Sequence, residues 1–162
     1  MSDSLKAAFP ADVSQWVLFN LAKEEFGVPA AQVQEIVRYP EVTHVPDMPQ
    51  FVKGVVNLRG KIVPILDLKE RFEIAGEPPA LGSRRIIVSL MGKDSVGLIV
   101  DAVLEVVRLE PQSISPVPAG LPQIDSEYLG GVGKFRDRLI VLLNLEKLLT
   151  AMEKKILGDL KG

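Results

Sequence analysis

The sequence matches itself at two places, and this internal repeat constrains the fold more than any other feature. Segment Val17–Arg38 aligns without a gap with Ile87–Arg108, seventy residues further along the chain. A second segment, Phe51–Phe72, aligns in the same way with Tyr128–Leu149, seventy-seven residues further along. Because each copy of a repeat forms one supersecondary unit, the second half is expected to rebuild the structure of the first.

Glycines and charged residues match between the copies, which argues against a chance alignment of apolar strands. The matched pairs are Gly27 with Gly97, Val33 with Val103, Glu35 with Glu105, Arg38 with Arg108, Gly54 with Gly131, Arg59 with Arg136, and Asp67 with Asn144. The extra residues of the second copy fall at 110–127, a stretch rich in proline, serine and glycine that is typical of a loop. The repeat halves are therefore placed at about 16–74 and 85–157, joined by an exposed linker at 75–84 and preceded by a flexible arm at 1–13.

Each copy has the pattern of short strands. From Val33 to Arg38, apolar and polar residues alternate, so Val33 and Glu35 share one face of a strand while Ile36 lies on the other. Short, regularly punctuated strands in duplicate predict a mainly β fold of two small antiparallel barrels. A unit of about seventy residues is near the lower limit for a stable core, so the halves are expected to share one. The pattern leaves open whether strands are exchanged between them.

Both copies end in a helical fragment preceded by a capping residue. Asp67 and Asn144 belong to the residue types that accept backbone N–H hydrogen bonds at helix starts. After Asn144, apolar residues at one-face spacing predict a longer C-terminal α-helix. Those residues are Leu145, Leu148, Leu149, Met152 and Ile156.

Composition excludes several classes of protein. The formal net charge is −2 and the sequence pI is about 5.5, which argues against nucleic-acid binding, since that needs a basic face. The chain has no cysteine, so it has no disulfide, thiolate metal site or cysteine nucleophile. No apolar run approaches the roughly twenty residues of a membrane span, and we expect a protein that does not insert into membranes.

The usual catalytic and cofactor patterns are missing from the sequence. His44 is the only histidine, and no serine or acid stands near it at motif spacing. The run "GGVGKF" from Gly130 to Phe135 fails as a phosphate loop, because Tyr128 occupies the place of the first glycine and Phe135 that of the hydroxyl residue. Asp101 is interpreted as a turn cap. We expect no catalytic residue, no metal site and no cofactor.

A binding module is the remaining class, and Arg59 is its first candidate contact. The turn "LRGK" needs Gly60 for a positive φ, whereas we expect position 59 to accept almost any residue. A guanidinium suits carboxylate or amide groups on a partner, and arginine is enriched at interface hot spots. A merely solubilising charge on an exposed turn is the alternative.

These residues together resemble the CheW family of chemotaxis coupling proteins, over nearly the whole chain from about Ser14 to Leu157. The most specific piece is the run "P-x-F-V-K-G-V-V-N-L-R-G-K-I-V-P-I-L-D-L" from Pro49 to Leu68. Supporting pieces are "EFGVPAAQVQEIV", "GLIVDAVLEVV" and "EYLGGVGKFRDRLIVLLNLEKLL". The resemblance implies two five-stranded SH3-like β-barrels packed together.

The resemblance also implies a function and partners. Members are non-enzymatic adaptors that join the cytoplasmic tips of methyl-accepting chemoreceptors to the regulatory domain of the histidine kinase CheA. It implies a cytoplasmic protein recruited to membrane-associated receptor arrays. A CheW-like regulatory domain belonging to a kinase, or to a receiver-fused coupling protein, is the alternative.

The family's functional positions can be carried over onto matching residues. Val33, Glu35 and Arg59 fall on positions linked to receptor binding, and Ile36 and Val100 are implied to line, with Val33, an apolar groove for the receptor's helical tip.

The implied kinase contacts are separate. Lys53 and Gly54 fall where the family's kinase binding is affected, although Gly54 is equally explained as a backbone requirement.

Overall fold

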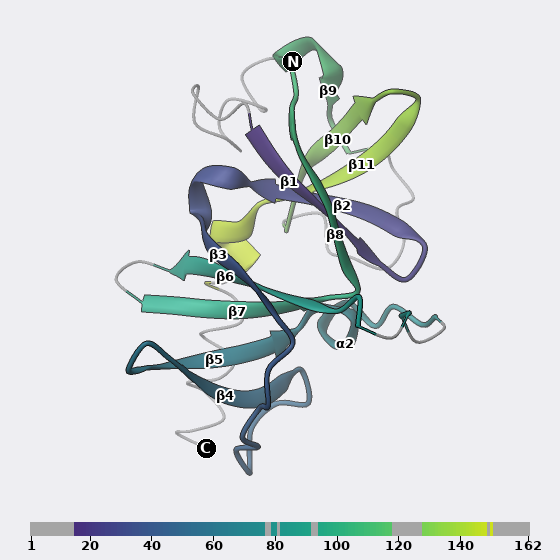
Figure 1. The fold of residues 1–162 in the computed structure, drawn as a ribbon. Helices are drawn as coiled ribbons and strands as arrows, with labels where there is room; N and C mark the ends of the chain where they lie inside the picture. Colours follow the sequence, from purple (N-terminus) through teal and green to yellow (C-terminus); the bar gives the residue numbers. More distant parts are fainter. Residues whose placement is uncertain are drawn as a thin grey trace.

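The structure is a computed structural model that describes residues 15–76, 79–80, 82–91, 94–117, 128–148 and 150. The arm expected at 1–13 and most of the helix expected after Asn144 lie outside these residues. Among the described residues the fold is mainly β, as the repeat predicts (Figure 1). None of the described helices is long and apolar enough to cross a membrane.

The strands form two mixed sheets (Figure 1). The first sheet has the order β8-β1-β2-β11-β10-β9. Its strands are β1 (Gln15–Leu21), β2 (Glu24–Pro29), β8 (Ala102–Arg108), β9 (Ile114–Ser115), β10 (Leu129–Phe135) and β11 (Arg138–Leu143). Neighbouring strands run antiparallel except β2 and β11, which run parallel. We call this sheet A.

The second sheet, which we call sheet B, has the order β3-β6-β7-β5-β4. Its strands are β3 (Val33–Arg38), β4 (Val52–Leu58), β5 (Lys61–Asp67), β6 (Arg85–Met91) and β7 (Asp94–Val100). The β5 and β7 strands run parallel, and the other neighbours antiparallel. The order of sheet B repeats that of the first five strands of sheet A, so the internal repeat is also a repeat of topology.

Each sheet contains strands from both copies. The hairpin β1–β2 of the first copy lies between β8 and β11 of the second, while the hairpin β6–β7 of the second copy lies between β3 and β5 of the first. The sheets are thus built by a reciprocal exchange of hairpins. Neither half of the sequence contains a complete sheet.

The two copies differ at the outer edges. In sheet B the edge strand β4 receives only an isolated bridge, from Thr43 to Val55. In sheet A the equivalent residue of β10, Val132, pairs with Ser115 of the short strand β9. This pair gives sheet A its sixth strand, where the resemblance implied five.

The described residues form three apolar clusters. One lies within sheet A and contains Trp16, Leu18, Val107, Leu109, Ile140 and Leu142. Another lies within sheet B and contains Val56, Val63, Ile65, Ile86, Val88 and Ile99. The largest draws residues from both sheets, including Phe19, Phe26, Leu66, Leu98 and Leu143. Burial of this last cluster requires both sheets, which accounts for two small modules forming one stable unit.

Both predicted helix caps are present. The Asp67 side chain accepts the Glu70 N–H at the start of α2 (Leu68–Phe72). The Asn144 side chain accepts the Lys147 N–H, and residues 145–148 are helical.

Candidate partner-binding surface

A carboxylate–guanidinium pair joins two sequence-predicted site residues that lie far apart in the chain. Arg59 Nη1 donates to Glu35 Oε2 at 2.6 Å. Glu35 lies on β3 and Arg59 in the β4–β5 turn, and these strands occupy opposite edges of sheet B. Sheet B must therefore curl so that its two edges approach each other.

The β3 strand presents an alternating surface, as its sequence pattern predicts. Val33 and Glu35 are half-buried, whereas the intervening residues face solvent. Ile36 is 39% exposed, which is high for an isoleucine. Strand β3 thus presents Ile36 on its exposed face and the ion-paired Glu35 on its other face, so one edge strand offers both apolar and charged groups to a protein partner.

The β4–β5 turn contradicts one expectation of the sequence analysis. Gly60 has a φ of 83°, as expected, but Arg59 also has a positive φ, 53°. Turns with two positive φ values favour asparagine, aspartate or glycine, so position 59 does not accept almost any residue without strain. A non-glycine residue in this conformation costs about 1–2 kcal/mol. The arginine is therefore not explained by the turn, and its side chain is 82% exposed.

Sheet A carries a related ion-pair cluster that the sequence analysis missed. Arg138 donates to Glu25 at 2.9 Å and to Glu105, the repeat equivalent of Glu35, at 2.8 Å. The hydrogen bond to Glu105, with Glu25 adding to it, raises the pKa of Arg138 above its ordinary value. Arg136 aligns with Arg59, but its guanidinium carbon lies 5.0 Å from the centre of the Phe135 ring. The repeat alignment could not reveal this cluster. Arg138, which binds Glu105, aligns with Lys61 of the first copy and not with Arg59.

The two implied kinase contacts lie on β4 and differ in exposure. Lys53 is half-exposed, and its Nζ lies 4.0 Å from carboxylate oxygens of both Asp67 and Glu70. Gly54 is buried beneath Thr43 and has a φ of 149°. A Cβ on Gly54 would lie 2.0 Å from the carbonyl oxygen of Thr43. Gly54 is therefore a backbone requirement whatever else it does.

Val100 is the buried member of the implied receptor groove, and Val33 packs against the same apolar cluster. The Val100 side chain is fully buried, at 0% exposure, within the apolar cluster shared by the two sheets. It supports the surface from beneath and offers no atom to a partner in this conformation. A continuous apolar run such as "VGLIV" does not reveal which of its residues faces outward.

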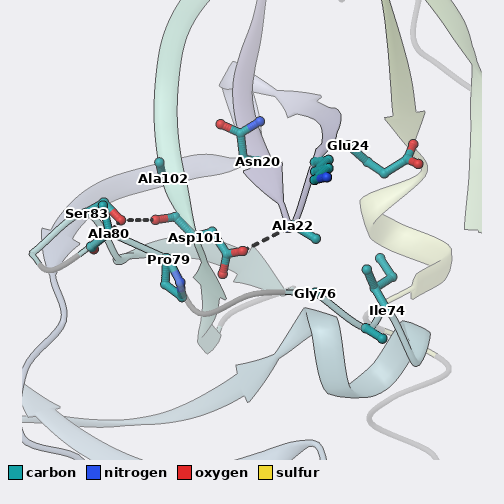
Figure 2. Close-up of a pocket in the computed structure, with 12 residues that line it drawn as sticks. Asn20, Ala22, Glu24, Ile74, Gly76, Pro79, Ala80, Ser83, Asp101 and Ala102 are labelled. Carbon is teal, nitrogen blue, oxygen red and sulfur yellow. Dashed lines mark hydrogen bonds between the residues drawn. The ribbon is translucent and has the colours of Figure 1, made fainter.

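An open recess of about 790 Å³ lies where the two sheets meet (Figure 2). Its most buried polar group is Asp101, whose Oδ2 accepts the Ala22 N–H at 2.8 Å and a hydrogen bond from Lys69 Nζ at 3.2 Å. Ser83 Oγ donates to the Asp101 carbonyl at 2.9 Å. Asp101 thus caps a turn, as interpreted, although the turn belongs to the other copy. These groups satisfy one another and tie the sheets together.

The residues tested for chemistry are dispersed. His44 is exposed in the segment before β4. Within the described part of the chain, no group of three or more histidine and acidic side chains is arranged to hold a metal ion.

Comparison with known proteins identifies the family. The model of the CheW-like domain matches residues 15–153. The chain is 36% identical to the chemotaxis protein CheW of Klebsiella aerogenes over 146 residues, which is 90% of this chain and 87% of that protein. The chain belongs to the CheW family.

Other CheW proteins agree with this assignment. The chemotaxis protein CheW of Helicobacter pylori is 32% identical, over 85% of this chain and 82% of that protein. The crystal structure of the scaffolding protein TtCheW from Thermoanaerobacter tengcongensis superimposes with a TM-score of 0.77 at 38% identity, covering 83% of this chain and 86% of that one. The CheW fold of two mixed sheets is therefore shared with an experimental structure.

Membership gives the class of function. This CheW chain is a non-enzymatic scaffold of chemotaxis signalling that couples chemoreceptors to CheA. Its activity consists of holding other proteins, so the surface residues described above matter more than any cavity.

Proposed function

We propose that this CheW chain binds the cytoplasmic tip of methyl-accepting chemoreceptors at the end of sheet B that carries Glu35 and Arg59. The single observation that carries the proposal is the 2.6 Å ion pair between these residues, which come from opposite edges of the sheet. The half-buried Val33 and the exposed Ile36 lie on the same strand as Glu35. A helical tip docking there would cover Ile36 and approach Arg59.

The conformation of Arg59 supports a binding role. Its backbone is strained, and its only hydrogen bond among the described residues is the one from Nη1 to Glu35. Glu35 holds the side chain in place, while the remaining guanidinium donors stay exposed for a partner. A donor that is oriented before binding loses less conformational entropy when the partner arrives.

The kinase surface is proposed to be a different part of the same sheet. Lys53 lies on β4, the outer edge strand, and it is shared loosely between two carboxylates. Such a lysine can turn to an acidic group on the regulatory domain of CheA. We assign Gly54 an indirect role, since it allows Thr43 to pair with Val55 and so shapes this edge.

The mechanism is positional. CheW holds a receptor and a kinase in one assembly, so a change in the receptor tip alters the contacts available to the kinase. No bond is made or broken by this chain. We place the protein in the cytoplasm, recruited to membrane-associated receptor arrays by its partners.

Replacement of Arg59 by alanine tests the proposal. We expect affinity for a receptor cytoplasmic fragment to fall about tenfold or more, as for an interface hot spot. The free energy of unfolding should change by less than about 1 kcal/mol, because an exposed ion pair contributes little. Titration calorimetry measures the first quantity and urea denaturation the second.

The repeat supplies a matched control. Arg136 occupies the equivalent turn position in sheet A with a φ of 50°, so Arg136→Ala removes the same side chain from the same backbone conformation. Receptor affinity should be unchanged in that variant. Equal losses in both variants, or a large loss of stability in Arg59→Ala, would refute the assignment.

A further inference from the structure

A cluster of arginines at one end of sheet B has no counterpart among the described residues of sheet A. Arg38 of β3 and Arg85 of β6 are directly opposite each other in the antiparallel register. Arg84 precedes Arg85 and packs over the ring of Tyr39, with its guanidinium carbon 4.5 Å from the ring centre. Like charges placed directly opposite on neighbouring strands are destabilising. The fold by itself gives no reason for this arrangement.

The charges of this arginine cluster are not neutralised by the carboxylates of the described residues. Among the described residues, no carboxylate lies within ion-pair distance of Arg38, Arg84 or Arg85. Within the described part of the chain, Arg85 donates only to the carbonyl oxygens of Gly82 and Arg84, at 2.7 and 2.8 Å. The ring of Tyr39 orients Arg84 without taking up its N–H donors. Arg84 and Arg85 are therefore held in place, and none of the three guanidinium groups pairs with a carboxylate of the described residues.

The equivalent position in sheet A lacks a second arginine. Arg108 is the repeat equivalent of Arg38, and the residue opposite it in the register is Gln15. The chain as a whole is acidic, with a formal net charge of −2. The concentration of positive charge is thus a local feature of sheet B, built from residues of both copies.

The cluster shares one face of β3 with Ile36, the exposed apolar residue of the proposed receptor surface. Gln34, Ile36 and Arg38 form the exposed face of β3. Alternate residues of a strand are about 7 Å apart, and side chains one turn apart on a helix are separated by about 5–6 Å. On a helix that carries an apolar and an acidic residue one turn apart, the apolar side chain can therefore cover Ile36 while the acidic one reaches Arg38. A free phosphate would use the arginines and leave Ile36 exposed.

We propose that Arg38, Arg84 and Arg85 bind an acidic segment of the receptor helix whose apolar side chain covers Ile36. The inference rests on the proposed function and adds the chemistry of the partner: carboxylates adjacent to an apolar contact. Guanidinium groups suit this partner, since each can bind a carboxylate through two parallel hydrogen bonds.

The test measures the affinity of the full chain for a receptor cytoplasmic fragment over a series of salt concentrations. We expect the double variant Arg38→Gln/Arg84→Gln to bind about tenfold more weakly than wild type at low salt, with the difference shrinking as salt screens the charges. The control Arg108→Gln should follow the wild-type curve. The variant Arg38→Lys/Arg84→Lys keeps the charge and should retain the salt dependence while losing part of the affinity.

Each outcome separates the inference from the proposed function. Parallel salt curves for wild type and the double glutamine variant would overturn the inference, even if Arg59→Ala still weakened binding. Stronger competition by inorganic phosphate than by chloride at equal ionic strength would assign the cluster to a phosphate ligand and also overturn it. Failure of the wild-type chain to bind the fragment would overturn both proposals. Unchanged unfolding curves would show that every variant remains folded.

Discussion

Replacing Gly54 by alanine tests the assignment of this residue as a backbone requirement. The new Cβ would lie 2.0 Å from the Thr43 carbonyl oxygen, far inside van der Waals contact, so Thr43 must move. Its movement breaks two backbone hydrogen bonds of 2.9 Å with Val55. Each such bond contributes about 0.5–1.5 kcal/mol, and the strained φ at position 54 adds about 1–3 kcal/mol. Gly54→Ala should therefore reduce the free energy of unfolding by about 2–6 kcal/mol.

The assay is urea unfolding, followed by far-ultraviolet circular dichroism and by fluorescence of Trp16, the only tryptophan. Gly60→Ala is the matched control, since Gly60 also has a positive φ but a Cβ there would meet nothing within 4 Å. It should cost about 1–2 kcal/mol, from strain alone. The reasoning is refuted if the two variants are equally stable. A stable Gly54→Ala protein that no longer captured the kinase would instead make Gly54 a direct contact.

Three further predictions concern the packing of the two sheets. Leu66→Ala should lower the free energy of unfolding by about 2–5 kcal/mol, because Leu66 is buried in the shared core; a neutral result in denaturant titration would place it outside that core. Asp101→Asn should cost about 1.5–3 kcal/mol by leaving Lys69 without its charged partner, and a double-mutant cycle with Lys69→Met should show coupling; additive losses would argue against the ion pair. Fragments 16–74 and 85–157 should each be unfolded by circular dichroism and regain structure when co-expressed, whereas cooperative melting of one fragment alone would contradict the exchanged hairpins.

Local features of this fold could be predicted from the sequence because they depend on neighbouring residues. The alternation of β3 follows from one residue in two facing the core, and the structure reproduces it from Val33 to Arg38. The caps at Asp67 and Asn144 depend on a side chain and a backbone N–H three residues away. The repeat supplied the long-range information, since matched segments were expected to form matched structures.

Pairing between the copies could not be predicted from the same pattern. The alternation of apolar and polar residues along a hairpin is the same whether the hairpin pairs with strands of its own copy or of the other. The exchange of β1–β2 and β6–β7 is therefore not visible in the local sequence. The full burial of Val100 could not be predicted for a related reason, because every residue of an apolar strand covered on both faces looks alike. The strain at Arg59 was missed because the sequence does not reveal that both central residues of its turn have positive φ.

The central claim is that this CheW chain works by holding a receptor and the kinase on separate surfaces. Co-sedimentation of CheA with receptor-containing membranes, measured with and without the chain, tests it most directly. We predict that wild type carries the kinase into the pellet, and that Arg59→Ala leaves both this chain and the kinase in the supernatant, still bound to each other. Equal recruitment of the kinase by wild type and Arg59→Ala, or recruitment in the absence of the chain, would contradict the account.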